Sequence, residues 1–131
     1  MSPLRFPSLD QRVELDRGEA GRLAQAVAAH VLALKASLPM AAASVLTCLP
    51  LIGLARQLNK LHHREQAAPP KPGKTPKPRT FRVSYDQLAA LLLNHAELDC
   101  WVDSPLEKLQ VRITIGKFQQ KSLNLSQYLT F

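Results

Sequence analysis

Seven basic residues recur at short intervals within positions 56–79 of this 131-residue chain. In chain order they are Arg56, Lys60, Arg64, Lys71, Lys74, Lys77 and Arg79. With Glu65 as the one acid among them, the segment has a net charge of +6, compared with +7 for the whole chain. A concentrated block of positive charge attracts anionic ligands, whereas dispersed charge mainly aids solubility. The first chemistry to consider is therefore contact with phosphate groups.

The spacing of these cations predicts how they are presented. Arg56, Lys60 and Arg64 are four residues apart, which places them on one stripe of a helix. Prolines then dominate 69–79, and because proline fixes φ and lacks a backbone donor, we expect an extended, polyproline-like arm there. A basic helix that continues into a basic arm can follow a nucleic-acid backbone with little sequence selectivity. The alternative is a solvated helix face followed by a solubilising linker.

A second phosphate-binding signal is excluded by its surroundings. Gly73-Lys74-Thr75 matches the end of a P-loop, but Ala68 occupies the position of the required first glycine. The prolines on either side also exclude the strand and the helix between which this motif must lie. A nucleotide-binding P-loop is therefore not expected.

Metal-binding and catalytic side chains lack the arrangement that their chemistry requires. The histidines and cysteines do not form the spaced pairs of a structural zinc site; they are His30, His62, His63, His95, Cys48 and Cys100. Cys48 lies in an apolar stretch, and acidic residues flank Cys100, so neither position suits a nucleophilic thiolate. No general base is paired with a nucleophile. We therefore expect a protein that is not an enzyme and that needs no metal or other cofactor.

The composition favours a mostly helical fold around a packed core. Hydrophobic residues make up 46% of the chain, and its 23 leucines and 16 alanines are among the best helix formers. We predict an α+β, predominantly helical protein in three parts: a helical hairpin over 1–68, a Pro/Lys-rich linker over 69–80 and a small α+β module over 81–131. Each folded part is near the size at which a core barely offsets chain entropy. The two parts must therefore dock on each other, or a partner must cover their apolar faces.

Capping signals predict an αα-hairpin in the N-terminal part. Ser8 and, more strongly, Asp16 begin capping boxes that mark possible helix starts. Pro39 should end the first helix, and Pro50 predicts a kink or break in the second. The 20 uncharged residues at 36–55 are long enough to span a bilayer, but their alanine and proline content favours a buried core element.

The C-terminal part is predicted to combine helices with a β-hairpin. Residues 81–83 are a short strand candidate, and Ser84 begins a capping box for a helix over 85–97. A short helix over 105–110 then precedes 111–125, where alternating apolar residues predict a β-hairpin. This order of elements is similar to the latter part of a winged helix, a variant of the helix-turn-helix readers of nucleic acid.

These observations predict a cytoplasmic protein that binds DNA or RNA, or that serves as an accessory subunit in a nucleic-acid complex. The N-terminus has no apolar signal region, so we expect both cysteines to be reduced thiols. One alternative is a protein–protein adaptor whose leucine-rich faces bind a protein partner or a second copy. A less favoured alternative is membrane association through 36–55, with the basic segment beside anionic headgroups.

Overall fold

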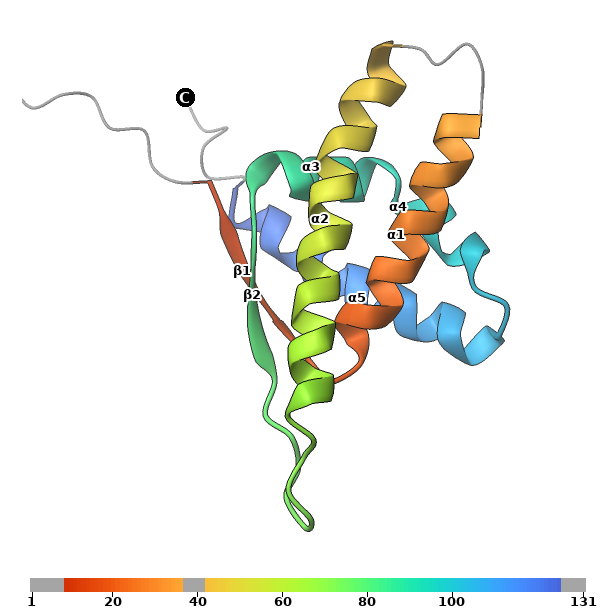
Figure 1. Ribbon diagram of the computed structural model, residues 1–131. Coiled ribbons are helices and arrows are strands. Elements are labelled where there is room, and N and C mark those ends of the chain that lie inside the picture. The colour runs from red at the N-terminus through yellow and green to blue at the C-terminus, as the bar shows by residue number, and fades with distance from the viewer. Residues whose placement is uncertain (1–8, 37–41, 126–131) are drawn as a thin grey trace, which may run out of the picture.

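The computed structural model describes residues 9–36 and 42–125, which form five α-helices and a two-stranded antiparallel sheet (Figure 1). The predicted α+β, predominantly helical class is confirmed. The elements in chain order are β1 (Gln11–Leu15), α1 (Glu19–Ala36), α2 (Ala42–Ala67), β2 (Arg79–Val83), α3 (Tyr85–Leu93), α4 (His95–Leu98), the 3-10 helix η1 (Asp99–Trp101) and α5 (Pro105–Leu123).

Helices α1 and α2 lie side by side and confirm the predicted αα-hairpin (Figure 1). The backbone N–H of Asp16 donates to the Glu19 carboxylate at 2.6 Å, so the capping signal at Asp16 marks the start of α1. Pro39, the predicted end of that helix, lies outside the described residues. Helix α2 runs through Pro50 without a break. Cys48, Leu51 and Leu54 pack into the core on both sides of that proline, and this burial offsets the roughly 3 kcal/mol that an internal proline costs.

The helix predicted to start at Ser8 is instead strand β1 from Gln11 onward; Ser8 itself lies outside the described residues. Val13 and Leu15 are buried while Arg12 and Glu14 are exposed, so a two-residue period decides the conformation. Strand β1 pairs with β2 in antiparallel register, with Val13 opposite Phe81. Residues 11–15 therefore form a strand, despite the capping signal at Ser8, because they pair with β2 far away in the sequence.

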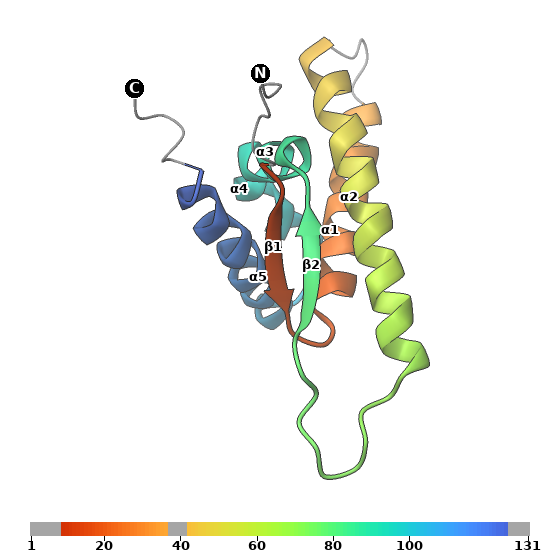
Figure 2. The same cartoon turned by 90° about the vertical axis from the view of Figure 1, so that its left-hand side faces the viewer.

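The two halves of the chain share one core, which is the first of the two arrangements that their small size predicted. Strand β1 belongs to the N-terminal half and β2 to the C-terminal half, and α5 packs against β1 and α1. Figure 2 shows α5 beside β1 and α2 beside β2. Phe81 and Phe118 meet edge to face in this core, with ring centroids 6.2 Å apart.

The β-hairpin predicted for 111–125 is wrong, because Pro105–Leu123 is one continuous helix. Ser104 caps it, with Pro105 in the first turn, as the sequence signal for a short helix indicated. The helix then continues because Val111, Ile115 and Phe118 lie on one buried face at helical spacing. In the described part of the chain, α5 therefore stands where a winged helix has its β-hairpin wing. The predicted helix over 85–97 is present as α3 and α4, and the Ser84 capping box is confirmed.

Segment 36–55 contributes one face of α2 to the core. Cys48, Leu51 and Leu54 are buried, whereas Val45, Leu46 and Leu49 are exposed. Among the described residues, no helix has both the length and the apolar character needed to cross a membrane.

Candidate nucleic-acid interface

The basic stripe predicted for 56–64 lies on α2. Arg56, Lys60 and Arg64 are all exposed, whereas Leu54 and Leu58 are buried on the opposite side. With a rise of about 1.5 Å per residue, successive cations of this stripe are about 6 Å apart along the helix axis. The amphipathic character of α2 thus positions a row of positive charge on the surface of the molecule.

The loop over 68–78 carries the row of charge beyond the end of α2. Lys71, Lys74 and Lys77 are all exposed. The predicted extended arm is not straight, because the Lys74 N–H donates to the Lys71 carbonyl at 3.1 Å and closes a tight turn. Pro72 and Gly73 occupy its centre, and Gly73 has φ of +78°, the pairing that a type II turn requires. Figures 1 and 2 show this loop projecting past the ends of α2 and of both strands.

The seventh predicted cation, Arg79, belongs to the sheet rather than to the loop. It begins β2, is half-buried and lies opposite Leu15. With Lys77 and Arg17 it lines a pocket of about 280 Å³ at the base of the loop, beside Glu65. The Arg17 guanidinium also donates to the carbonyl of Ala68 at 3.3 Å and so anchors the first residue of the loop.

Arg17 is an interface candidate that sequence analysis missed. In the sequence it stands beside Asp16 and close to Glu19, and it looks like one member of a balanced surface cluster. The register of β1 with β2 places it at the base of the loop instead. The position of Arg17 follows from the pairing of β1 with β2, and local sequence patterns do not predict that pairing.

The cations of the basic segment are not neutralised by carboxylates. Within residues 9–36 and 42–125, none of the seven forms an ion pair, whereas Arg82, Arg112 and Lys117 each do. Glu65, the one acid of the segment, is 2% exposed, and its Oε2 accepts a hydrogen bond from the Gly18 N–H at 3.0 Å. That carboxylate joins α2 to the turn before α1 and lines the same pocket as Lys77 and Arg79, without an ion pair to either.

The buried carboxylate of Glu19, at the start of α1, is occupied by internal contacts. Glu19 is 5% exposed, and its carboxylate accepts from the hydroxyl of Thr114 at 2.8 Å and from the ammonium of Lys117 at 2.5 Å. Partial burial lowers the pKa of Lys117, but the hydrogen bonds to Glu19 and Asp16 outweigh it, and that pKa is raised overall. These groups hold α1 on α5.

A buried histidine holds α1 on the segment after α3. His30 is 2% exposed; its Nδ1 accepts from the Trp101 indole N–H at 3.2 Å, and its Nε2 lies 3.0 Å from the Asn94 amide oxygen. Acceptance at Nδ1 places the proton of the neutral ring on Nε2, where it donates to Asn94. His30 is therefore a hydrogen-bonded core residue, whereas His95 is exposed.

The remaining reactive side chains are dispersed. Cys48 is buried, Cys100 is exposed, and both are free thiols. In the described part of the chain, no three histidine, cysteine or acidic residues lie close enough to hold a metal ion. Comparisons with protein-family models, curated proteins and solved structures found no match to this chain. A proposal for its function therefore rests on the geometry of the cationic surface.

Proposed function

We propose that the protein binds nucleic acid, without a chemical step, through phosphate contacts made by α2 and the loop over 68–78. The observation that carries this proposal is the continuity of exposed and unneutralised cations from the α2 stripe into the projecting loop. When such a surface contacts a phosphate backbone, counterions condensed on the nucleic acid are released. This release is the main source of sequence-independent affinity.

The two parts of this surface have different roles in the proposal. The α2 stripe is rigid, so Arg56, Lys60 and Arg64 contact one stretch of backbone in a fixed register. The loop turn brings the backbones of Lys71 and Lys74 together in the projecting loop, and both side chains are exposed. Prolines on either side of the turn restrict the unbound loop, which reduces the conformational entropy lost on binding. Neither part presents an array suited to base edges, so sequence preference is expected to be weak.

A salt titration tests the proposal directly. If about four to six cations meet phosphates, log K against log salt on duplex DNA should have a slope of about −3.5 to −5.5. Changing Lys71, Lys74 and Lys77 to glutamine should flatten that slope by about two to three units. A matched variant with Arg5, Lys35 and Lys108 changed to glutamine loses the same charge outside the segment and should keep the wild-type slope.

Two results would contradict the proposal. One is the absence of measurable binding to duplex DNA and to RNA at low salt. The other is a wild-type slope that survives both the loop substitutions and the change of Arg56, Lys60 and Arg64 to glutamine, because another surface would then carry the binding.

A second candidate function, that of a protein–protein adaptor, is favoured by exposed apolar side chains on α5. Leu106, Leu109 and Ile113 are between 53% and 63% exposed and follow one face of the helix. If this function is correct, the immobilised protein should retain a stoichiometric partner from nuclease-treated lysate, and Leu109→Glu should release it. A partner that survives this substitution would exclude α5 as the docking face.

A further inference from the structure

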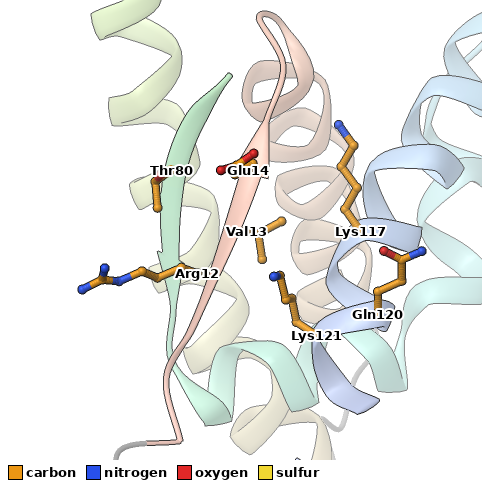
Figure 3. A pocket seen from close by; sticks show the side chains of 7 residues that line it. All are labelled: Arg12, Val13, Glu14, Thr80, Lys117, Gln120 and Lys121. Carbon is orange, nitrogen blue, oxygen red and sulfur yellow. The ribbon is translucent and has the colours of Figure 1, made fainter. Parts of the chain in front are cut away.

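Strand β1 has one unpaired edge. In the described part of the chain it pairs with β2 alone, and the other edge opens onto a groove of about 470 Å³ between β1 and α5. Figure 3 shows Lys117, Gln120 and Lys121 of α5 on one side of this groove and residues of β1 on the other. An unpaired edge presents a row of backbone N–H and C=O groups to a further strand.

The charges along this edge are self-complementary. Arg12 and Glu14 flank the buried Val13, and both are exposed on the outer face of the sheet. Neither forms an ion pair within the described residues. When a second copy of β1 is paired antiparallel about Val13, Arg12 of each copy lies opposite Glu14 of the other. Charged side chains are one means by which natural proteins protect an edge, and a charge pattern that pairs with itself does not give this protection.

The face of α5 that carries Gln120 becomes apolar toward the start of the helix. Leu106, Ile113 and Gln120 are seven residues apart and lie on one face of α5, and Gln120 lines the groove. Leu106 is 63% exposed and Ile113 is 53% exposed. Figure 2 shows α5 beside β1.

We infer that the protein forms a homodimer in which the β1 strands of two copies pair antiparallel about Val13. The product is a four-stranded sheet in the order β2-β1-β1-β2, with the same surface buried on both copies, as two-fold symmetry requires. Two Arg12–Glu14 pairs, related by the two-fold axis, fix the register. This inference concerns a surface distinct from the α2 stripe and does not depend on nucleic-acid binding.

Charge exchange tests the register of the dimer. Sedimentation velocity of the wild-type protein over increasing concentration should show reversible dimer formation. Arg12→Glu places Glu opposite Glu, and Glu14→Arg places Arg opposite Arg, so each should weaken association by on the order of tenfold or more. An equimolar mixture of the two variants restores both opposite-charge pairs and should dimerise again. The double variant, with Arg12→Glu and Glu14→Arg in one chain, should also recover.

The controls separate charge pairing from misfolding and from net charge. Circular dichroism should show an unchanged helical signal in every variant, because both side chains are exposed. Arg12→Gln with Glu14→Gln should associate with an affinity between those of the wild-type protein and the single charge reversals. Lys35→Glu makes the same charge change as Arg12→Glu at a distant position and should leave association unchanged. A wild-type protein that stays monomeric at its highest soluble concentration overturns the inference. So does a dimer that both single variants retain, or one that neither the mixture nor the double variant restores.

Discussion

The carboxylate of Glu19 and the ammonium of Lys117 join α1 to α5, although the two residues are 98 positions apart in the sequence. The Lys117 side chain is 30% exposed, so the pair is only partly shielded from water. Such a pair stabilises the fold mainly because removal of the cation leaves a buried carboxylate without its charged donor. The ion pair between Glu19 and Lys117 therefore stabilises the packing of α1 on α5.

Lys117→Met should lower the free energy of unfolding by about 1–2 kcal/mol at neutral pH. The folded-state pKa of Lys117 is raised above its ordinary 10.5, so this stabilisation is complete below that value. It is lost as pH rises through the higher folded-state pKa, and the difference between variant and wild type should shrink accordingly. Urea unfolding from pH 7 to pH 11 measures both quantities.

Lys121→Met is the matched control, because Lys121 lies one turn later on α5 and forms no ion pair within the described residues. Its stability relative to wild type should not depend on alkaline pH. A Lys117→Met difference that stays constant from pH 7 to pH 11 would show that packing of the side chain, rather than its charge, stabilises the contact.

The capping box that begins at Asp16 is a local signal for Glu19, whereas the burial of Glu19 depends on distant residues. The Asp16 N–H does donate to Glu19, as the spacing predicts. The other partners, Thr114 and Lys117, come from a helix that the sequence pattern assigned to a β-hairpin. The buried acid could therefore not be foreseen from its neighbours.

At the scale of elements, α5 shows why a short apolar run is ambiguous. Residues 111–115 alternate in polarity like a strand, yet Val111 and Ile115 are also four residues apart. The tertiary contact decides, since Val111, Ile115 and Phe118 are buried together and Ile113 is exposed. Helices α1 and α3 were predictable because the capping signals at Asp16 and Ser84 agreed with a helical spacing of the apolar residues that follow.

Glycine substitution distinguishes the helix from a hairpin at this point. Gly116 lies inside α5, and an added Cβ would meet no atom within 4 Å. Gly116→Ala should therefore stabilise the protein by about 0.5–1 kcal/mol in thermal or urea unfolding. A glycine at the turn of a β-hairpin would show the reverse, because alanine is strained at positive φ.

The same substitution at Gly21 should have the opposite sign. Gly21 also lies in a helix, but an added Cβ would lie 2.5 Å from the ring of His62 on α2. Gly21→Ala should therefore destabilise the protein by about 1–3 kcal/mol, because the two helices can no longer approach as closely. Equal effects at the two positions would contradict the packing of α1 on α2.

At the scale of the whole molecule, the loop over 68–78 connects two parts of one core. Lys74 is the most accessible trypsin site in it, because Lys71 and Lys77 precede prolines and Arg79 is paired in β2. Native trypsin should cut first after Lys74. The two fragments should then co-elute in size-exclusion chromatography and separate only in urea, because β1 pairs with β2 and α5 packs on α1 across the cut.

Separation of the fragments under native conditions would show that the two halves fold independently. A first cut within α3 or α5 would instead show that these helices open more readily than the loop. Sequence analysis predicted a linker over 69–80 from its prolines and lysines, but residues 79 and 80 belong to β2. It did not predict that the chain returns along β1 afterwards, because strand pairing between distant segments has no local signature.

The pairing of β1 with β2 also determines when the protein can fold during its synthesis on the ribosome. Strand β1 and the buried face of α1 emerge early, but β2 is complete only at Val83, and Phe118 lies later still. Until then the nascent chain must hold an unpaired strand and an open apolar helical hairpin. Chains stalled before residue 118 should therefore be protease-sensitive throughout 9–67, and protection should arrive in one step once α5 has left the exit tunnel. Protection of the hairpin in shorter chains would show that α1 and α2 are stable before the rest of the core exists.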